Sequence, residues 1–450
     1  MSKVILSNCQ QEALDGFIDF IDSPDPWMII SGFAGSGKSF LVEYMTEVAD
    51  NVLKLQQHLS VAYKAPVFHF TATTNKAAAV LTQMLGQEAR TIHSLLGLKL
   101  TTNYDTGKQR LVRKKGRKVR ATANSIIFID EASMINRELM HYIKKYQESN
   151  KGCKIVFIGD PYQLPPVKED PCNVFNAPEH HFFLDKIQRQ VAGSPIIQLS
   201  AKYREVLDKP ELPWPRIESD GEHIFFYDKK IDFDVAIATR MGKTHDPQQH
   251  KVLAWKNDTV RDYNTWLRKM HGYTEPFELN EVFMTNKPII SGNQIWAPTD
   301  SLVRIEDIEE HEASGIKGYM LLISAVNRSL PHLKIFQPAD WKKVKPLSNA
   351  FANDKNWQAY YYIKEQWADL RPIHALTVHK SQGSTYKEVF VDLKDIGLNT
   401  RWQETARLAY VAITRASDRL HIYGSISTDH STTKQKNTVL ERFKNVEHLL

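Results

Sequence analysis

The sequence predicts an α/β fold in which a parallel sheet is covered by helices on both faces. Three continuous apolar runs, near residues 27–31, 126–129 and 154–158, indicate this fold because such runs suit strands that are buried on both sides. Each run ends in glycine or acidic residues that would lie at one edge of the sheet. At 450 residues, with 42% hydrophobic and 24% charged residues, the chain suits a globular protein of about two to four domains.

A glycine-rich turn, "SGFAGSGKSF", follows the first run and leads into an amphipathic helix. Its Gly32, Gly37, Lys38 and Ser39 fit the phosphate-loop pattern of Gly, four residues, Gly-Lys and a hydroxyl residue. The glycines let backbone N–H groups and the helix N-terminus face phosphate oxygens, while Lys38 reaches the β- and γ-phosphates and Ser39 ligates Mg²⁺. We therefore expect ATP and Mg²⁺ as cofactors. The predicted nucleotide-binding residues are Gly32, Ala34, Gly35, Ser36, Gly37, Lys38, Ser39 and Phe40.

The other two runs end in polar residues that suit catalysis. After "SIIFI", Asp130 can hold Mg²⁺ through water, and Glu131 can orient and deprotonate the attacking water. After "CKIVFIG" come Asp160 and Gln163, and a carboxylate and an amide at this sheet edge suit sensing of the γ-phosphate. A plain strand exit, followed by prolines that stop pairing, explains the third run equally well.

Composition argues against several classes of protein. No apolar run approaches the roughly 18 residues that span a bilayer, and the N-terminus is typical of a capped helix rather than a secretion signal. Cys9, Cys153 and Cys172 are an odd number without paired spacing, so we expect neither a disulfide framework nor a zinc site. The net charge of +6 permits a polyanionic partner without establishing one. We expect a cytoplasmic protein with no membrane partner.

A set of ordered motifs resembles the superfamily 1 DNA helicases, in the 1B branch of RecD-like and phage Dda-like enzymes. These motifs are "GFAGSGKS", "TATTNKAAAVL", "TIHSLL", "IIFIDEASM", "FIGDPYQLPPV", "ALTVHKSQGSTYKEVFVDL" and "LAYVAITRASDRL". With the helix at the N-terminus they extend over residues 6–424, so the resemblance covers nearly the whole chain.

The resemblance implies two RecA-like P-loop domains with ATP in the cleft between them and single-stranded DNA across the top. It also implies a β-hairpin (pin) insertion and an SH3-like β-barrel insertion. The expected division is 1–200 for domain 1A with the pin (1B) at about 98–124, 201–280 plus 371–450 for domain 2A, and 281–370 for the SH3-like 2B with a following helix.

The resemblance also assigns residues around the nucleotide. Gln10 matches an adenine-reading glutamine, although the adjacent Gln11 leaves the register open. Arg189 and Arg415 match arginines that point at the γ-phosphate, a task that suits a planar, permanently charged side chain. Gln382 and Gly383 would link the nucleotide cleft to the DNA. The expected catalytic residues are thus Lys38, Glu131, Gln163, Arg189 and Arg415.

Small hydroxyl and amide side chains after the strand in "TATTNKAAAVL" can bind backbone phosphates without reading sequence. We expect a DNA track in the first domain and a second grip on the other domain. The candidates are Thr73, Thr74, Asn75, Thr91 and His93 on the first, and Thr377, His379 and Ser381 on the second. His379 alone would more often be a structural histidine; its motif favours DNA contact.

The predicted pin is unusually basic, since every charged residue from 108 to 120 is Lys or Arg. Such density usually marks a solvated surface, but at this insertion point it favours contact with a polyanion. Tyr104 is the aromatic residue available for stacking at a fork. Further along, residues 208–222 read as a linker, 251–269 as a strand and helix, and 281–345 as alternating antiparallel strands. Residues 347–370 read as helical, with an aromatic stripe that favours core packing: Trp357, Tyr360, Tyr361 and Trp367.

The expected function is an ATP-driven helicase that moves 5′→3′ on single-stranded DNA and separates duplex strands. The polarity comes from the resemblance, and the residues themselves do not distinguish DNA from RNA. Two alternatives remain, a translocase that strips proteins from DNA without unwinding it and a nucleotide-dependent DNA-binding module. Expected partners are single-stranded and forked DNA and replication or recombination proteins, with a monomeric chain that could be phage-encoded and act in the host cytoplasm.

Overall fold

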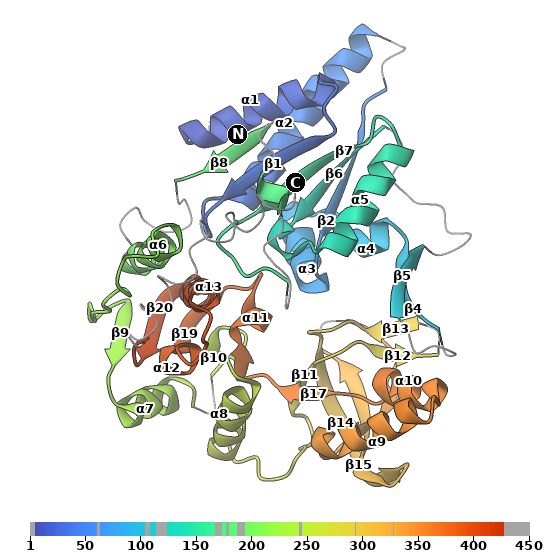
Figure 1. Ribbon diagram of the computed structural model, residues 1–450, viewed down its shortest axis with the longest axis vertical. Helices are drawn as coiled ribbons and strands as arrows, with labels where there is room; N and C mark the ends of the chain where they lie inside the picture. The colour runs from blue at the N-terminus through green and yellow to red at the C-terminus, as the bar shows by residue number, and fades with distance from the viewer. Residues whose placement is uncertain are drawn as a thin grey trace, which may run out of the picture.

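The computed structural model describes residues 5–426 apart from 61–63, 104–108, 114–123, 167–172, 177–179, 187–193, 243–244, 293 and 327. Two helix-covered parallel sheets and an antiparallel sheet form the molecule (Figure 1). Among the described residues, no helix is long and apolar enough to cross a membrane.

The first sheet has six parallel strands in the order β3-β2-β6-β7-β1-β8. The strands are β1 (Trp27–Gly32), β2 (Val67–Ala72), β3 (Arg90–Thr91), β6 (Ser125–Asp130), β7 (Lys154–Gly159) and β8 (His181–Leu184). Successive side chains of a strand point to opposite faces, and β1 therefore sends Met28 and Ile30 to one core and Ile29 to the other. The buried apolar runs that predicted parallel strands are confirmed as β1, β6 and β7.

Helices cover both faces of this sheet. The core that contains Met28 also receives α1 (Asn8–Asp22), α2 (Lys38–Leu59) and α3 (Asn75–Leu85). The core that contains Ile29 receives α4 (Ile92–Leu95), the short 3₁₀ helix η1 (Ala132–Met134) and α5 (Arg137–Ser149). A further 3₁₀ helix, η2 (Asn173–Asn176), places Val174 in the same core.

The second sheet has five parallel strands in the order β18-β10-β19-β20-β9. They are β9 (Ile224–Tyr227), β10 (His250–Ala254), β18 (Ala375–Thr377), β19 (Tyr386–Asp392) and β20 (Ala416–Tyr423). One face is covered by α6 (Pro195–Asp208), α11 (Val378–Ser381), α12 (Leu393–Ile396) and α13 (Trp402–Ile413), and the other by α7 (Lys230–Arg240) and α8 (Asn257–Met270). Two α/β domains of the same design are thus present, as the sequence predicted.

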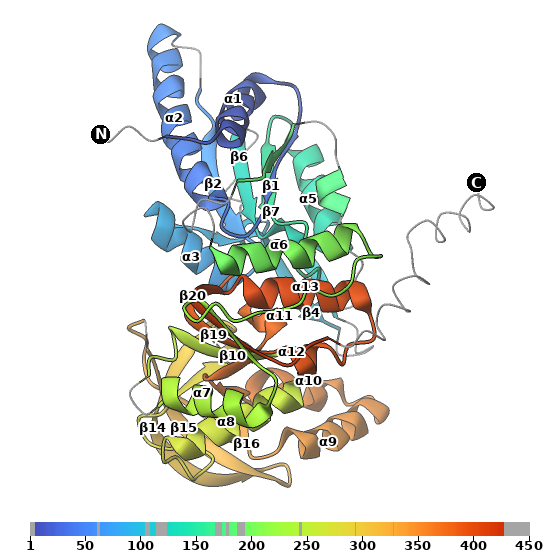
Figure 2. The ribbon, with the colours of Figure 1, turned by 90° about the vertical axis from the view of Figure 1, so that its left-hand side faces the viewer.

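The helix α6 spans the expected division after residue 200. Its buried Ile196, Leu199 and Tyr203 pack in the core of the second sheet, next to α13. Figure 2 shows α6 and α13 stacked at the level where the two domains meet. The expected linker 208–222 also packs on this core through Trp214 and Ile217.

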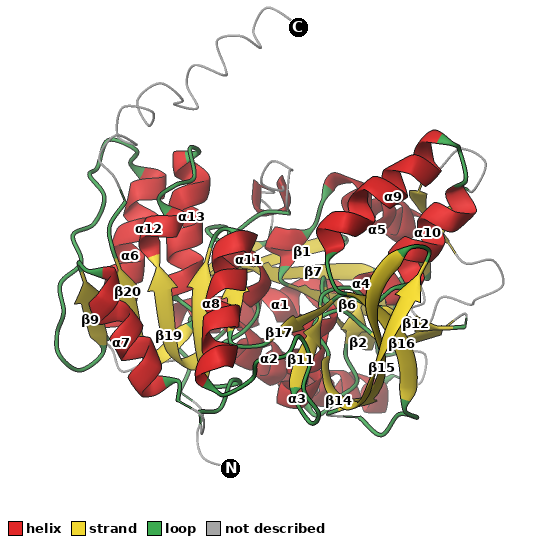
Figure 3. Ribbon diagram, turned by 90° about the horizontal axis from the view of Figure 1, so that it is seen from below, coloured by secondary structure: helices red, strands yellow, loops and turns green. Residues whose placement is uncertain are grey.

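The chain leaves the second domain after α8 and returns at β18, and the residues between form the antiparallel sheet β16-β15-β14-β11-β17. Its strands are β11 (Val282–Thr285), β14 (Leu302–Ala313), β15 (Ile316–Ala325), β16 (Leu333–Pro338) and β17 (Leu370–Pro372), with a separate hairpin of β12 (Ile289–Ser291) and β13 (Gln294–Ala297). Seen from below in Figure 3, it lies beside the second parallel sheet.

Two helices pack on this antiparallel sheet, α9 (Trp341–Asn353) and α10 (Trp357–Gln366). The prediction that residues 347–370 are helical is therefore confirmed for most of this range. The helical region begins earlier, at Trp341, and is interrupted between α9 and α10. The core reading of the aromatic stripe holds for Tyr361 and Trp367, which are buried, whereas Trp357 and Tyr360 are half-buried.

A second hairpin projects from the first domain. It pairs β4 (Leu98–Thr102) with β5 (Gln109–Arg113), antiparallel, inside the segment where the insertion was expected. Its base is fixed to α5, because the Tyr142 hydroxyl donates to the Leu111 carbonyl at 2.5 Å and Arg113 lies over the Tyr146 ring. In the view of Figure 1 the hairpin extends toward the end of the molecule that carries β12 and β13.

Candidate functional site

The phosphate loop joins β1 to α2 and depends on its glycines. Gly35 and Gly37 both have φ of 82°, a left-handed conformation that favours glycine. A Cβ on Gly32 would lie 2.7 Å from the Leu184 carbonyl oxygen, so a side chain there would collide with β8. The Ser36 hydroxyl is buried and has no hydrogen-bond partner within the described residues. The loop therefore presents a buried donor and a cradle of backbone amides at the start of α2.

Lys38 curls back over this loop. Its Nζ donates to the carbonyls of Gly32 and Phe33, both at 2.8 Å. Ser39 follows it in the first turn of α2, and both residues line a cavity between the two domains. A phosphate group in the cradle would compete with these carbonyls for the ammonium, since a charged acceptor makes the stronger hydrogen bond.

The acidic pair sits at the end of β6. Glu131 has φ of 54°, an uncommon conformation for a residue other than glycine, and its N–H donates to Asp130 Oδ1 at 2.8 Å. Burial, together with the neighbouring Asp130 charge, raises the pKa of Glu131 to about 7, although Arg415 and Lys38 oppose the shift. Burial likewise raises the pKa of Asp130. A strained, proton-accepting carboxylate in a cavity is typical of a general base.

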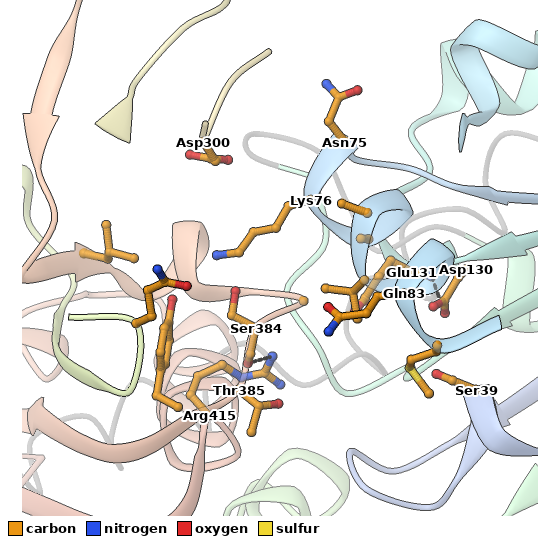
Figure 4. Close-up of a pocket in the computed structure, with 18 of the residues that line it drawn as sticks. Ser39, Asn75, Lys76, Gln83, Asp130, Glu131, Asp300, Ser384, Thr385 and Arg415 are labelled. Carbon is orange, nitrogen blue, oxygen red and sulfur yellow. Dashed lines mark hydrogen bonds between the residues drawn. The ribbon is translucent and has the colours of Figure 1, made fainter. Parts of the chain in front are cut away.

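One cavity of about 1350 Å³ brings the predicted residues together from both domains. Lys38, Ser39, Asp130 and Glu131 line it from the first domain, and Arg415 from the second. In Figure 4, Arg415 and Glu131 approach from opposite sides. Arg415 is buried and positioned by bonds from Nε to the Val411 carbonyl (3.0 Å) and from Nη1 to the Ser384 carbonyl (2.9 Å).

Among the glutamines, the structure distinguishes Gln10 from Gln11. Gln10 is 2% exposed, lines the cavity, and its Nε2 lies 3.5 Å from the Ser36 carbonyl oxygen. Gln11 is exposed and bonds to Asp15 within its own helix. Gln10 therefore holds the position beside the phosphate loop. Phe40, which also lines the cavity, is exposed and stacks on Tyr44.

Gln163, Gln382 and Gly383 meet where the two domains touch. Gln382 Nε2 donates to Gln163 Oε1 at 3.1 Å and to the Leu164 carbonyl at 3.2 Å. Gly383 has φ of 72°, and a Cβ there would lie 3.6 Å from Glu131 Oε1. A hydrogen bond thus joins Gln382 to Gln163, which lines the same cavity as Lys38 and Glu131.

Sequence reasoning missed a second set of contacts across the domains. Tyr410 on α13 donates to Asp160 Oδ2 at 2.6 Å and accepts from the Ala34 N–H at 3.2 Å. Arg407, one turn earlier, donates to the Pro161 and Gln163 carbonyls. Arg204 lies over the Phe33 ring at 3.3 Å. Polar residues at helical spacing on the otherwise buried α13 were the available signal.

Three of the threonines expected to contact DNA are helix caps. Thr74, Thr91 and Thr377 each accept the backbone N–H three residues on, at the start of α3, α4 and α11. A hydroxyl that accepts in this way keeps its own proton as a donor. Asn75, next to Thr74, is exposed. The Thr73 hydroxyl donates to the Glu131 carbonyl at 3.3 Å, and the Thr73 N–H donates to the Asp130 carbonyl.

The two domains present their histidines in the same way. Thr91 ends β3 at the edge of the first sheet, two residues before His93. Thr377 likewise ends β18 at the edge of the second sheet, two residues before His379. Burial lowers the pKa of both histidines, against the carboxylates of Glu138 and Glu404. Both rings are half-buried and neutral near pH 7, which suits hydrogen bonding rather than a fixed charge.

Ser381 differs from the expectation. It is fully buried, and its hydroxyl donates to the Val378 carbonyl at 2.7 Å, so it holds the one-turn helix α11 together and offers no surface to a strand. Arg189 and Tyr104 lie outside the described residues.

Two domain families match the chain. Residues 6–208 match the family described as AAA domain, and residues 372–423 match the UvrD-like helicase C-terminal domain. The first match covers the first parallel sheet and α6, and the second covers β18, β19 and β20 of the second sheet.

Relatives and a solved structure are similar over almost the whole chain. Uncharacterized protein R530 of Acanthamoeba polyphaga mimivirus is 24% identical across 91% of this chain and 98% of its own. ATP-dependent DNA helicase dda of Enterobacteria phage T4 is 22% identical across 91% and 97%. A structure from work on DNA unwinding at forked dsDNA by two coordinating Pif1 helicases has a TM-score of 0.52 at 16% identity, covering 99% and 97%, which shows a shared fold.

The matched families, the full-length relatives and the fold agree with the resemblance that the motifs carry. The chain is a superfamily 1B helicase of the branch that contains the RecD-like and Dda-like enzymes.

Proposed function

We propose that this chain is an ATP-dependent DNA helicase that travels 5′→3′ along single-stranded DNA and separates the strands of a duplex. The observation that carries the proposal is the shared cavity, in which Lys38 of the first domain and Arg415 of the second face one site. Hydrolysis in such a site depends on how closely the domains approach, and that dependence couples chemistry to movement. The relative from phage T4, an ATP-dependent DNA helicase, supports the same activity.

The residues of the cavity divide the chemistry among them. The loop amides and Lys38 hold the phosphates, Gln10 lies where an adenine ring would be read, and Glu131 accepts the proton of the attacking water. Arg415 offsets the charge that develops on the transferred phosphoryl group, a role in which arginines contribute about 10³- to 10⁵-fold in rate in other nucleotide hydrolases. Gln163 and Arg189 complete the proposed catalytic set.

The donors at this site fit a magnesium ion. Ser39 offers a hydroxyl oxygen and Asp130 a buried carboxylate, the hard oxygen ligands that Mg²⁺ prefers. When bound, Mg²⁺ would neutralise charge on the β- and γ-phosphates. A nearby cation would also favour the ionised forms of Asp130 and Glu131 against the burial that raises both pKa values.

Two grips on DNA would alternate as the cleft opens and closes. We assign Thr73, Thr74, Asn75, Thr91 and His93 to the first grip, and Thr377 and His379 to the second. These side chains can donate to backbone phosphates, a contact that positions a strand without reading its sequence. The bond between Gln382 and Gln163 runs from the second grip to the nucleotide cleft and would carry the state of one to the other.

We further propose roles for the two insertions. The β4–β5 hairpin, with its basic segment and Tyr104, would act as the pin that splits the duplex, and the antiparallel sheet with β12–β13 would be the SH3-like subdomain behind it. We place the domain division before α6, near residue 194, since α6 packs with the second sheet. A monomer in the cytoplasm of its host, working with replication or recombination proteins, is the setting that we propose.

Unwinding of forked substrates tests the proposal. The substrates carry a 5′ or a 3′ overhang, built with DNA or RNA arms, and strand release is followed with ATP and Mg²⁺. We expect release only from DNA with a 5′ overhang. Release only with a 3′ overhang would reverse the polarity, and an ATPase that single-stranded DNA does not stimulate would favour the binding module.

The Glu131→Gln variant isolates the chemistry. The amide keeps the shape of the side chain and cannot accept the proton, so we expect turnover to fall to near background while ATP binding persists. Full hydrolysis by this variant would reject Glu131 as the base.

A further inference from the structure

Three histidines meet in the second domain, next to the start of β18. They are His245 in the loop after α7, His271 at the C-terminal end of α8, and His374 between β17 and β18. One nitrogen from each ring lies within 4.8 Å of the other two. The three ring centroids are 4.9 to 5.2 Å apart. Among the described residues, no other group of three or more His, Cys, Asp or Glu side chains is placed in this way.

The hydrogen bonds around the cluster leave one ring nitrogen of His245 and one of His271 free to act as acceptors. His245 Nδ1 donates to the Gly242 carbonyl at 2.9 Å, and His271 Nε2 donates to the Met241 carbonyl at 2.8 Å. Each ring therefore keeps its other nitrogen as an acceptor. His245 Nε2 lies 3.3 Å from His374 Nδ1. Histidines that bind metals characteristically donate the second ring N–H to a carbonyl in this manner, which fixes tautomer and orientation.

The spacing suits a tetrahedral ion. With metal–nitrogen distances near 2.0–2.1 Å, nitrogens at the corners of a tetrahedron stand roughly 3.4 Å apart. The His245–His374 pair already has this separation, and small side-chain rotations would bring the His271 nitrogen to it. The described protein ligands fill three positions and leave one for water or another donor.

The electrostatics favour neutral imidazoles, which are the form that binds metal. Burial and the neighbouring His271 and His245 lower the pKa of His374 to about 2, and burial lowers that of His245. Arg268, the nearby guanidinium, is already paired with Glu281 at 2.6 Å. Lys251 would repel a cation, but burial lowers the pKa of this amine to about 7, so it can release its proton when a metal arrives.

From this geometry we propose that His245, His271 and His374 form a binding site for a divalent transition-metal ion of the Zn²⁺ class. Imidazole nitrogens suit Zn²⁺ and its neighbours Co²⁺, Ni²⁺ and Cu²⁺, whereas Mg²⁺ prefers oxygen. On binding, His374 coordinates through Nδ1 and carries its ring proton on Nε2 instead.

The position of the cluster gives the ion a structural task. The chain leaves the second domain at His271 to form the antiparallel sheet and comes back at His374, three residues before Thr377 of the second DNA grip. A metal bound to both residues would link the two ends of the segment 271–374 where it joins the second domain. Cross-links that close long loops restrict the unfolded chain most. The ion would also fix β18, which leads directly into Thr377 and His379.

Zinc binding by the full-length chain tests this site. The chain is treated with a chelator, exchanged into excess Mg²⁺ without nucleotide, and titrated with Zn²⁺ in competition with a chromophoric zinc indicator. We expect one tightly bound Zn²⁺ per chain in the wild type. His374→Gln and His245→Ala should each weaken binding by at least about tenfold, since even outer partners of metal ligands contribute 10- to 100-fold. His141→Ala, which removes an exposed histidine of the first domain, is the matched control and should bind as the wild type does.

Thermal unfolding gives a second measurement that does not depend on His374→Gln folding well. Zn²⁺ should raise the unfolding midpoint of the wild type and of His141→Ala and leave that of His245→Ala unchanged, because this variant lacks one of the three ligands. His245 is half-buried in a loop, so its replacement removes no core side chain. No stoichiometric zinc in the wild type, or equal binding and equal stabilisation in His245→Ala, overturns the proposal.

Discussion

Glu131 combines an uncommon backbone conformation with a carboxylate that is hard to ionise. Both properties come from its place at the end of a buried strand, between Asp130 and the basic groups Arg415 and Lys38. Residues held in left-handed conformations persist only where the surroundings determine them, and such residues cluster at active sites. At the scale of single residues, this position is where structure and chemistry are most closely joined.

A pH profile of hydrolysis tests the state of Glu131. Only the ionised carboxylate accepts a proton, and the pKa of about 7 belongs to the free enzyme, so kcat/KM for ATP should fall about tenfold per pH unit below 7 and level off above it. The measurement uses saturating DNA and excess Mg²⁺, which keeps the nucleotide in one form. A profile that stays flat from pH 6 to 8 would contradict this assignment.

Much of the site could be predicted from sequence because its residues lie in short contiguous motifs. Lys38, Ser39, Asp130 and Glu131 follow strands whose apolar runs are legible without a structure. Tyr410 and Arg204 were missed for the opposite reason. Their importance comes from contacts with Asp160 and Phe33, far away in the chain, which become visible only when the domains are assembled.

At the scale of elements, the β4–β5 hairpin is the element that we propose as the pin. Its strands are tied to α5 by the bond from Tyr142, so the hairpin base is held against the first domain. A wedge must be rigid to direct movement of the strand into separation of the duplex. That need distinguishes an unwinding enzyme from a translocase that only displaces proteins.

Replacing residues 101–123 with a short Gly-Ser turn should abolish unwinding of forked DNA and leave DNA-stimulated ATPase nearly unchanged. The variant removes the wedge and keeps both grips and the nucleotide cavity. Strand release and phosphate release are measured on the same preparation. Tyr142→Phe, which loses only the anchor to Leu111, should show a partial defect in unwinding. If unwinding survives the deletion, the hairpin is not the pin.

Glu388 on β19 contributes to the stability of the second sheet through its buried carboxylate. Burial alone would raise its pKa, but hydrogen bonds from His421 and Arg240 lower it to about 2. A depressed carboxyl pKa stabilises the fold above the unfolded value, near 4.5, and this contribution is lost as the pH falls toward 2.

Glu388→Gln should therefore lower the free energy of unfolding by about 2 kcal/mol at pH 7, less than a fully buried pair because Arg240 is 38% exposed. The difference from the wild type should shrink at acid pH. Urea unfolding measures both quantities. Lys387→Gln, an exposed change on the same strand, should alter stability by less than about 0.5 kcal/mol. An equal loss in the two variants would contradict the role of Glu388.

Some elements escaped sequence analysis for physical reasons. β9 and α7 are short and carry weak periodicity, and β9 gains its place by pairing with β20, nearly two hundred residues later in the chain. The division expected after residue 200 falls within α6, because a helix can pack on either domain and its amphipathic pattern does not say on which. The long alternating strands of the antiparallel sheet were legible because their period of two extends over many residues.

At the scale of the whole molecule, several hydrogen bonds between described residues join the two domains. Tyr410 bonds to both Asp160 and the phosphate loop, and Gln382 donates to Gln163. Arg407 donates to the carbonyls of Pro161 and Gln163. Each is a directional hydrogen bond that forms only at one relative placement of the domains. Their strength therefore sets how firmly the cleft is held closed.

Tyr410→Phe should reduce kcat about tenfold, equivalent to about 1.4 kcal/mol, with little change in affinity for single-stranded DNA. The variant keeps the ring and removes the one hydroxyl that joins Asp160 to Ala34. Steady-state ATPase and fluorescence anisotropy with labelled DNA give the two quantities. Tyr362→Phe, which changes an exposed tyrosine of α10, is the control and should be close to the wild type. Indistinguishable kinetics for both variants would remove Tyr410 from the closure.

The turn after β2 connects the residues proposed to bind DNA to the catalytic carboxylate. Thr73 is fastened by its amide to the Asp130 carbonyl and by its hydroxyl to the Glu131 carbonyl, while Thr74 and Asn75 beside it face the proposed DNA track. A DNA strand that displaced this turn would also displace the backbone of Asp130 and Glu131, which sets the position of the Glu131 carboxylate. If these residues bind DNA as proposed, a bound strand would reorient the Glu131 carboxylate and change how readily it takes the proton of the attacking water.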